Sequence, residues 1–297
     1  MPRALLIAGP TASGKSALAL QYAQLTGATI VNADSMQVYR DLRILTARPS
    51  PEEERFASHI LFGEIDGSVN FSVGRYEARA REILGQRLGP IVFVGGTGLY
   101  FLALTEGLSD IPPVPEEVRN KVRQAATGRE TTDLHVELAR LDPASAERLH
   151  RSDRQRILRA LEVIEATGHS LLEFQNRRAA PALSPGQWSG IFLAPERDAL
   201  KHNIADRFAR MVAAGALEEV ARLAERRFDP ALPIMRAHGV PHLLAHLRGD
   251  ISLDEAAALG VRDTTAYAKR QFTWARHQLP AFAWMTPDEA ATALAPH

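Results

Sequence analysis

An eight-residue segment near the start of the chain has the spacing of a phosphate-binding loop. Residues 9–16 read Gly-Pro-Thr-Ala-Ser-Gly-Lys-Ser and match the pattern G-x-x-x-x-G-K-[ST] in full. Glycines let backbone N–H groups converge on phosphate oxygens, and the start of a helix adds favourable partial charge. Lys15 would neutralise the terminal phosphate, and the Ser16 hydroxyl would complete a magnesium shell. We expect a diphosphate or triphosphate to bind here together with Mg²⁺.

Asp34 is a candidate for chemistry because it directly follows the apolar run 29–33. In a parallel sheet, residues just past the carboxyl ends of the strands line the ligand crevice. A carboxylate there could ligate magnesium or act as a general base. Asp34 or Ser35 could equally cap a helix, and spacing alone leaves both interpretations open.

A third polar segment, Gly-Gly-Thr-Gly-Leu-Tyr at residues 95–100, follows another apolar run. Consecutive glycines permit a tight turn, and Thr97 can offer its hydroxyl and N–H group to a phosphate. Taken alone, the segment would be a strand–helix turn with Thr97 as the cap. Convergence of three such strand ends on one crevice favours the ligand-binding role.

The elements that position these segments alternate between strands and helices. Short apolar runs predict strands at 4–8, 29–33 and 90–94, and helical periodicity predicts helices at 16–25 and 73–88. Strands separated by helices imply right-handed crossovers and a parallel sheet. The predicted fold class is α/β, with a core like that of P-loop NTPases.

A helical insertion interrupts this core. The proline-rich segment 111–115 is a plausible boundary, residues 116–178 are helical in pattern, and 179–189 have the composition of a linker. Residues 190–194 predict a strand that rejoins the sheet, and 198–279 are mostly helical. The predicted organisation is a core of residues 1–114 and 190–297 with a helical C-terminal tail, and a helical insertion domain of residues 115–189.

Composition limits the class of protein. Apolar residues make up 45% and charged residues 24% of the 297 residues, which is typical of a globular protein. The absence of cysteine excludes disulfides and thiolate metal sites and fits a reducing compartment. There is no signal-peptide pattern, and no stretch approaches the roughly 18 apolar residues of a membrane-spanning helix. We expect a soluble cytoplasmic protein with no membrane partner. We also expect a monomer, because nothing in the sequence demands a partner surface.

Five segments together resemble the tRNA dimethylallyltransferase family, also called tRNA isopentenyl transferases. They run nearly end to end, in the family's order. They are residues 9–16, D-S-M-Q-V-Y at 34–39, G-G-T-G-L-Y at 95–100, D-R-Q-R-I-L-R-A-L-E-V at 153–163 and Y-A-K-R-Q-F-T-W at 267–274. Eukaryotic relatives often add a zinc-finger tail, so its absence here fits the bacterial type.

The resemblance implies transfer of a dimethylallyl group from dimethylallyl diphosphate to the exocyclic N6 amine of the adenine 3′ to the tRNA anticodon, with release of diphosphate. It implies that the loop holds this diphosphate with Mg²⁺, although the motif is typical of ATP-binding sites. Asp34 would be the general base, Thr97 would contact the diphosphate, and Arg207 would neutralise the leaving group. The diphosphate-binding residues would be Gly9, Thr11, Ala12, Ser13, Gly14, Lys15 and Ser16.

The same resemblance implies that the target adenine of the anticodon stem-loop is flipped into a channel, where Ser35, Met36 and Gln37 match the positions that read it. Net charge is formally zero, so binding RNA would need local basic patches. One candidate patch holds five arginines: Arg148, Arg151, Arg154, Arg156 and Arg159. A solvated helix face is the plain alternative, but the family match over 155–159 favours phosphate contacts. The implied tRNA-binding residues are Asp34, Ser35, Met36, Gln37, Thr97, Arg119, Gln155, Arg156, Arg159, Lys269 and Arg270.

Two local features stay open. Phe272 and Trp274, beside the basic residues near 270, could stack on RNA bases or belong to the core. The family's arginine followed by a glycine–tyrosine pair is only partly kept, because Arg236 and Gly239 are present and the tyrosine is replaced by valine.

The main rival hypothesis is a P-loop kinase of a small metabolite. It would share the phosphate loop and Asp34, but it would not need the arginine-rich insertion or the 267–274 segment. A second rival is a nucleotide-dependent RNA-binding regulator without chemistry of its own.

Overall fold

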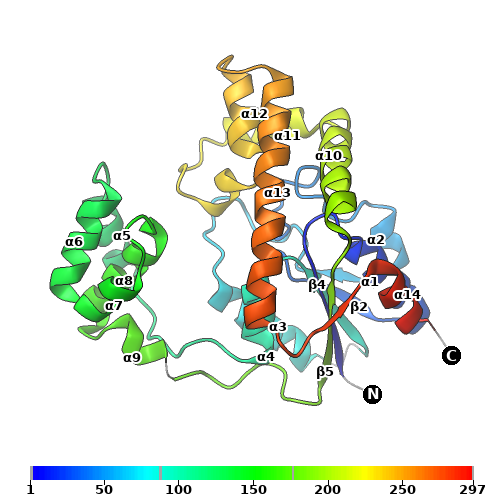
Figure 1. Ribbon diagram of the computed structural model, residues 1–297, viewed down its shortest axis with the longest axis horizontal. Coiled ribbons are helices and arrows are strands. Elements are labelled where there is room, and N and C mark those ends of the chain that lie inside the picture. Colours follow the sequence, from blue (N-terminus) through cyan, green and yellow to red (C-terminus); the bar gives the residue numbers. More distant parts are fainter. Residues whose placement is uncertain (1–2, 87–88, 176, 296–297) are drawn as a thin grey trace. The chain divides into compact units, whose positions relative to one another are not determined.

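Six parallel strands form one sheet in the order β3-β2-β4-β1-β5-β6. The computed structural model describes residues 3–86, 89–175 and 177–295 (Figure 1). All strand pairs are parallel, and β1 pairs with both β4 and β5. The strands are β1 (Ala4–Ala8), β2 (Thr29–Asn32), β3 (His59–Ile60), β4 (Ile91–Gly95), β5 (Trp188–Leu193) and β6 (Ala283–Met285).

The sheet is buried on both faces, as parallel sheets usually are. Along β1, Leu5 and Ile7 pack with α1 (Lys15–Thr26) and α14 (Pro287–Ala293), whereas the alternate residues face the opposite side. That side is covered by α3 (Val73–Gly85), α4 (Gly98–Thr105) and part of α13 (Leu253–Gln278). The α/β prediction is therefore confirmed, because continuous apolar strand runs are the mark of strands buried on both sides.

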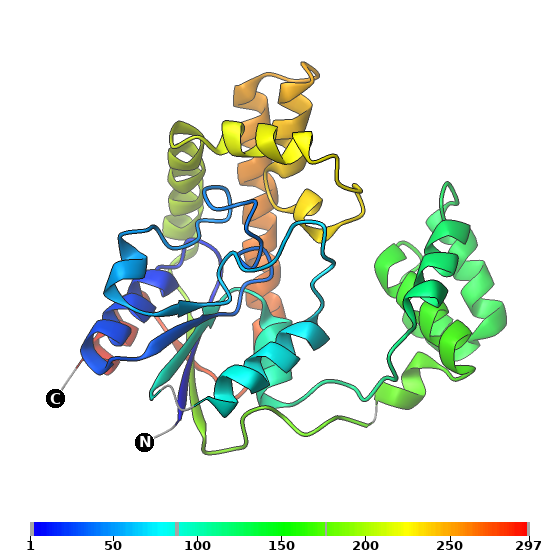
Figure 2. The same ribbon diagram turned by 180° about the vertical axis from the view of Figure 1, so that it is seen from behind.

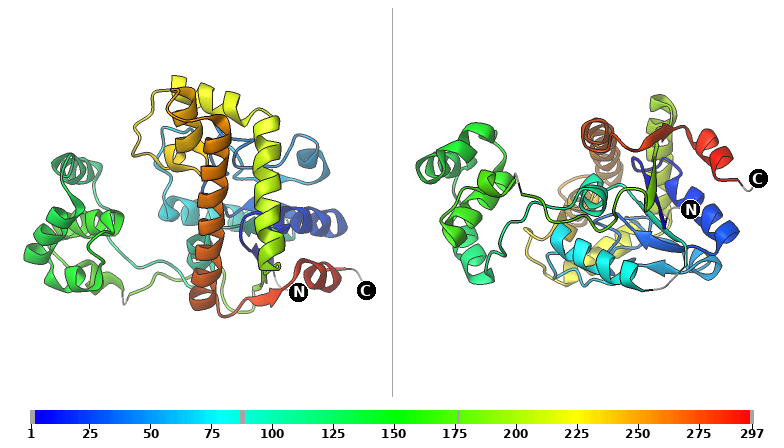
Figure 3. Two further views of the ribbon diagram at one scale, coloured as in Figure 1. Left: turned by 45° about the horizontal axis from the view of Figure 1, so that its top comes forward. Right: turned by 90° about the horizontal axis from the view of Figure 1, so that it is seen from below.

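The helices that follow β5 form the C-terminal part of the α/β core. They are α10 (Arg197–Ala213), α11 (Ala216–Glu225), the 3₁₀ helix η1 (Pro233–Arg236), α12 (Val240–Leu247) and α13. Helices α10 and α13 run side by side (Figures 1 and 3). Gly260 permits this approach, because a Cβ there would lie 2.5 Å from the Phe208 ring.

The remaining differences from the predicted elements lie at short or terminal segments. Helix α3 ends at Gly85, and residues 87–88, predicted as its end, lie outside the described residues. Strand β5 begins at Trp188, inside the segment predicted as a linker. The short elements β3, β6, α2 (Glu53–Phe56) and α14 were not predicted, because two to seven residues carry too little periodicity.

A second compact unit comprises residues Glu106–Pro181, and the first comprises Met1–Thr105 with Ala182–His297. The helices of the second unit pack around an apolar core of their own, which includes Leu138, Ile157 and Val163. They are α5 (Glu116–Ala125), α6 (Thr131–Leu141), α7 (Pro143–Arg148), α8 (Arg154–Thr167) and α9 (Leu171–Gln175). Residue 176, within the predicted helical stretch, lies outside the described residues.

No helix within the described ranges is long and apolar enough to cross a membrane.

Candidate active site

The phosphate loop connects β1 to α1 through a strained backbone. Gly14 has a positive φ of 86°, and Ala12, with a φ of 62°, also lies in the left-handed region that side chains disfavour. Such turns point successive N–H groups to one side and make a concavity suited to anions. Gly9 is needed for space, because a Cβ there would lie 3.0 Å from the Ser13 hydroxyl oxygen and 3.2 Å from the Leu193 carbonyl.

Buried polar groups of this loop are only partly satisfied. The Ser13 hydroxyl is buried and has no hydrogen-bond partner in the described part of the chain. Lys15 is 7% exposed, and its ammonium donates to the Pro10 carbonyl at 2.9 Å. Burial and the nearby Arg207 lower the pKa of Lys15 to about 8, and Asp34 partly offsets this. An anion in the loop would therefore meet a desolvated cation and an unpaired hydroxyl.

Arg207 projects from α10 toward the same place. Burial and Arg210 lower the pKa of its guanidinium, while the charge of Asp34 opposes the shift. The predicted catalytic carboxylate, the loop lysine and this arginine therefore lie close enough to influence one another, although they come from three separate parts of the sequence.

Asp34 lies in a turn beyond β2, so the helix-cap interpretation is wrong. Its Oδ1 accepts a hydrogen bond from the Met36 N–H at 2.9 Å, and its own N–H donates to Asn32 Oδ1 at 2.8 Å. Asn32 is fully buried, and its Nδ2 donates to the carbonyls of Asp34 and Leu61. Asn32 thus fixes the turn that presents the carboxylate, a role not predicted from the sequence.

Thr97 joins the ends of β2 and β4. Its hydroxyl accepts from the Ser35 N–H at 2.9 Å and donates to the Ser35 hydroxyl at 3.2 Å. Its N–H, expected to face phosphate, donates to the Ala33 carbonyl at 3.1 Å. Burial and the charge of Asp34 raise the pKa of the nearby Tyr267, and an interaction with Thr97 partly offsets this. The hydroxyl of Thr97 therefore contacts the Asp34 turn and does not cap α4.

Glycines of the 95–100 segment serve close packing. None of them has a positive φ. A Cβ at Gly95 would lie 2.0 Å from the Ala33 carbonyl oxygen, one at Gly96 would lie 2.3 Å from Gln271, and one at Gly98 would lie 2.2 Å from Trp274. These glycines therefore do not serve a tight turn, as expected, but let the end of β2 and helix α13 pack closely against this segment.

Gln271 connects two of the predicted segments. It is 9% exposed on α13, and its Nε2 donates to the Gly96 carbonyl at 2.7 Å. Its Oε1 accepts from the Thr11 N–H at 3.2 Å. Although Gln271 falls within a matched family segment, no role was predicted for it. The available signal was a polar residue on the buried side of a helix.

An apolar cavity of about 260 Å³ adjoins these glycines. Phe101, Phe192, Trp274 and Leu279 contribute aromatic and aliphatic surface, and Thr97 lies at its polar edge. An apolar hollow beside an anion-binding loop could hold a short hydrocarbon attached to a phosphate.

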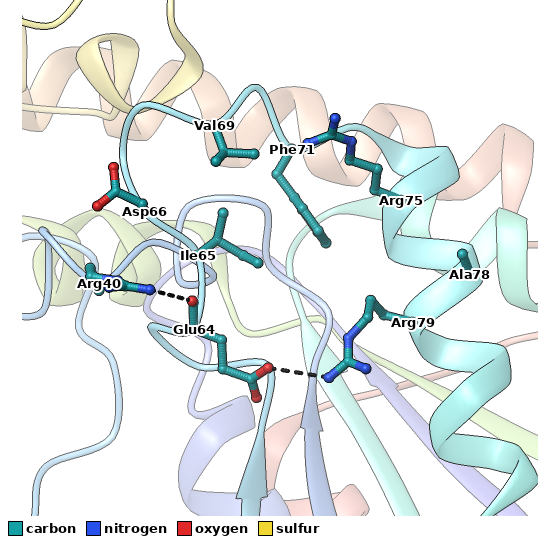
Figure 4. Close-up of a pocket in the computed structure, with 9 residues that line it drawn as sticks. All are labelled: Arg40, Glu64, Ile65, Asp66, Val69, Phe71, Arg75, Ala78 and Arg79. Carbon is teal, nitrogen blue, oxygen red and sulfur yellow. Dashed lines mark hydrogen bonds and ion pairs between the residues drawn. The ribbon is translucent and has the colours of Figure 1, made fainter. Parts of the chain in front are cut away.

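A second hollow, of about 500 Å³, lies near the start of α3 (Figure 4). Arg40 donates to the Glu64 carbonyl at 3.0 Å, and Arg79 pairs with the Glu64 carboxylate at 3.5 Å. Arg40 and Arg79 are therefore already engaged with Glu64, which makes this hollow a weaker candidate for an anion than the phosphate loop.

The residues expected to read a base lie beside Asp34. Ser35 is half-buried, and Met36 packs against the core. Gln37 is 8% exposed, and its Nε2 donates to the carbonyls of Thr46 at 2.9 Å and Ala47 at 3.3 Å. Within the described residues no donor bonds the amide oxygen of Gln37, so this oxygen is the atom available to a base.

Near residue 270, the basic side chains are exposed, whereas the aromatic side chains pack inside the protein. Lys269 and Arg270 are exposed, and the Arg270 guanidinium lies 5.7 Å from the centre of the Tyr267 ring. Phe272 packs on Phe192, with ring centres 5.6 Å apart, and Trp274 covers Gly98. Both aromatics therefore belong to internal packing.

The segment that departs from the family pattern also reaches this region. His238 lies against Tyr267, with ring centres 4.7 Å apart. Burial and Arg270 lower the pKa of His238. Gly239 has a φ of 94°, and a Cβ there would lie 3.0 Å from the Phe208 ring, so glycine is required at this position. Val240, at the position of the missing tyrosine, is buried.

In the second unit, the arginine patch has mixed roles. Gln155 and Arg156 are exposed on α8, whereas Arg119 and Arg159 are half-buried. Arg159 lies 3.7 Å from the buried carboxylate of Glu162, which also pairs with Arg123 at 2.8 Å. Arg156 pairs with Asp153 at 3.5 Å.

Arg154 differs from the other arginines of this patch. It donates to the carbonyls of Ala126 and Arg129, at 2.5 and 2.8 Å, and so satisfies the end of α5. Its guanidinium therefore has a role within the unit, and its predicted phosphate contact stays a prediction.

No cluster of three or more histidine, aspartate or glutamate side chains able to hold a metal occurs among the residues described. A cation would therefore need oxygens from the bound anion as well as from the protein. The site combines an anion cradle, two nearby cations and one carboxylate, an arrangement suited to moving a group away from a phosphate leaving group.

Comparisons with known proteins place this site in context. A family model described as IPP transferase matches residues 37–278, and one described as isopentenyl transferase matches residues 2–64. The chain is 62% identical over 296 residues to a tRNA dimethylallyltransferase of Methylocella silvestris, covering 98% of each chain.

Solved structures are also similar. A full-length tRNA isopentenylpyrophosphate transferase from Bacillus halodurans is 30% identical, with a TM-score of 0.69, over 99% of this chain and 94% of that one. A eukaryotic dimethylallyltransferase acting on tRNA is 26% identical, with a TM-score of 0.81, over 96% of this chain and 74% of that one.

Proposed function

The chain belongs to the IPP transferase family and is a tRNA-modifying enzyme, and we propose that it transfers the dimethylallyl group of dimethylallyl diphosphate to the N6 amine of the adenine 3′ to the anticodon, releasing diphosphate. The observation that carries the proposal is the meeting of Lys15, Arg207 and Asp34 beside the phosphate loop. The cations suit a diphosphate leaving group, and the carboxylate suits a base.

The residues divide into two roles. Asp34 accepts the proton lost when the N6 amine attacks the first carbon of the dimethylallyl group. Lys15 and Arg207 stabilise negative charge that develops on the diphosphate as the carbon–oxygen bond breaks. Thr97 holds the turn that carries Asp34, and its contact with the diphosphate is the one that the family resemblance implies.

Dimethylallyl diphosphate fits the phosphate loop and the apolar cavity beside it. Its diphosphate lies in the loop, where the Ser13 hydroxyl lacks a partner among the described residues. Its five-carbon chain lies in the apolar cavity bounded by Phe192 and Trp274. This apolar neighbour favours a prenyl diphosphate over ATP as the ligand of the loop.

Magnesium fits the donor set. The Ser16 hydroxyl is exposed at the start of α1, and no hydrogen bond to it occurs in the described chain. Together with oxygens of the bound diphosphate and water, it would supply the oxygen ligands that Mg²⁺ prefers. Bound there, the ion would neutralise part of the diphosphate charge.

The proposed tRNA contacts follow from the family resemblance, and their side chains are exposed or half-buried. Gln155, Arg156, Arg159 and Arg119 of the second unit, with Lys269 and Arg270 of the first, bind the anticodon stem-loop through its phosphates. The flipped adenine lies by Ser35, Met36 and the amide oxygen of Gln37.

The test is prenyl transfer from radiolabelled dimethylallyl diphosphate to unmodified tRNA. We expect label in the RNA with the wild-type chain and at least a ~100-fold lower rate with Asp34→Asn, because general bases contribute about that much. Asp198→Asn is the matched control, since Asp198 is exposed on α10 and pairs only with Lys201 in the described chain. Absence of label, with phosphate transfer from ATP to a small acceptor, would support the kinase instead.

A further inference from the structure

Glu219 is a buried carboxylate outside the groups assigned above. It lies on α11 with 5% of its surface exposed. One carboxylate oxygen accepts from the N–H groups of Arg43 at 2.6 Å and Ile44 at 2.9 Å, and the other accepts from the Leu45 N–H at 2.9 Å. No ion pair of Glu219 occurs within the described ranges, so backbone amides hold its charge, with electrostatic support from the nearby Arg48 guanidinium.

These amides belong to a turn whose shape leaves them needing an acceptor. The Thr46 hydroxyl donates to the Leu42 carbonyl at 2.8 Å, and the Ala47 N–H donates to the Ile44 carbonyl at 2.9 Å. Ala47 adopts a left-handed φ of 49°. Successive N–H groups that point one way form an anion-binding concavity. Here the anion comes from α11, the yellow helix above the blue loop in Figure 2.

The far side of the turn holds two groups of the active site. The Thr46 carbonyl accepts from Gln37 Nε2 at 2.9 Å and lies 3.5 Å from Arg207 Nη2. The Ala47 carbonyl also accepts from Gln37. One buried carboxylate is therefore connected, through one short turn, to a base-reading amide and a leaving-group arginine.

We propose that Glu219 is a positioning residue, which holds the turn at residues 43–47 so that its carbonyls orient Gln37 and Arg207. The inference rests on the proposed function. Small displacements of groups around a reacting centre cost rate steeply, by ~100-fold for about 1 Å. Glu219 would therefore affect transfer although it touches neither substrate.

The experiment compares Glu219→Gln with Glu218→Gln in the labelled prenyl-transfer assay. Glu218 is exposed on the same helix, so it controls for charge and for helix propensity. In Glu219→Gln, an amide group would oppose one backbone N–H. We expect kcat to fall about 10-fold or more, and amide hydrogen exchange at Arg43, Ile44 and Leu45 to accelerate, with no change in Glu218→Gln.

A coupling measurement separates positioning from general support of the fold. In a Gln37→Ala, Arg207→Ala background, Glu219→Gln should cost less than about 2-fold, because the groups it orients are gone. An equal cost in both backgrounds would overturn the proposal, and so would equal rates for Glu219→Gln and Glu218→Gln. If Glu219→Gln does not fold, Glu219→Asp, which keeps the charge but shortens the reach, is judged by the same criteria. Failure of wild type to transfer label would instead refute the proposed function.

Discussion

Trp274 combines two roles at the residue scale, since it covers Gly98 and forms a wall of the apolar cavity. Trp274→Ala should raise the KM for dimethylallyl diphosphate about 10-fold, equivalent to about 1.4 kcal/mol of lost contact. Use of the longer donor geranyl diphosphate should rise relative to wild type. Steady-state kinetics with both donors measures this. Trp188→Ala is the control, because Trp188 packs on Phe282 and does not itself line the cavity. Unchanged donor preference in Trp274→Ala would place the prenyl group elsewhere.

His238 provides a prediction of pH dependence. Because burial and Arg270 lower its pKa in the folded chain, the unfolded chain binds more protons just below the ordinary value of about 6.5. Its contribution to stability is therefore complete above about pH 6.5 and declines as pH falls toward the lowered value. Asp263 and Asp34 oppose the shift, and His242 adds to it.

NMR titration of the His238 ring, identified by comparison with His238→Asn, should give a midpoint below that of an unperturbed histidine. Arg270→Gln should raise this midpoint by removing a nearby positive charge. Arg262→Gln, a change on the same helix, should act less, because Arg262 is not among the groups that shift His238. A midpoint in wild type at or above the ordinary value would contradict the arrangement.

At this scale, the sequence predicts the site residues that lie in recognisable motifs, but not the residues that hold them in place by hydrogen bonds. The structure brings Lys15, Asp34 and Arg207 together, and two of these lie in motifs at predicted strand ends. Asn32, Gln271 and Glu219 were missed because their value lies in hydrogen bonds to distant backbone groups. Neither periodicity nor residue type records such partners.

At the scale of elements, we expect Arg154 to stabilise the second unit and its near neighbour Arg151 to contribute little to stability. Arg154→Ala should lower the free energy of unfolding by about 1.5–3 kcal/mol, because its charged hydrogen bonds to two carbonyls at the end of α5 are lost. Arg151→Ala should change it by less than about 0.5 kcal/mol, because Arg151 is exposed. Urea denaturation of both variants measures the difference. Equal stabilities would mean that Arg154 contributes no more than a surface side chain.

Elements were predictable where they are long or fully buried. The strands 4–8, 29–33 and 90–94 were found because both faces are apolar, which produces uninterrupted runs. The edge strands β3 and β6 span two and three residues, and their pairing depends on neighbours rather than on their own sequence. The 95–100 segment was located, but the prediction that its glycines serve a tight turn was wrong. They make room for α13, which is a tertiary contact that the local sequence does not record.

For the whole molecule, the chain leaves and re-enters the first unit at adjacent points. The Leu183 N–H donates to the Leu104 carbonyl at 2.9 Å, on either side of the second unit. Replacing residues 106–181 by a short glycine–serine linker should therefore leave the first unit folded and able to bind inorganic diphosphate. Affinity for tRNA should fall by about 10-fold or more, because phosphate contacts dominate such binding. Calorimetry with diphosphate and filter binding with tRNA test both halves. Loss of diphosphate binding in a folded variant would contradict the assignment of the loop.

Gln271 has a consequence for the order in which the enzyme becomes competent during synthesis. The phosphate loop leaves the ribosome long before Gln271, the residue that holds its Thr11 amide and that lies 260 residues later in the chain. The central strand β1 also waits for β5, which follows the second unit. A nascent or prematurely terminated chain thus carries the phosphate-loop motif without the finished cradle. The activity therefore arises only after α13 has been synthesised.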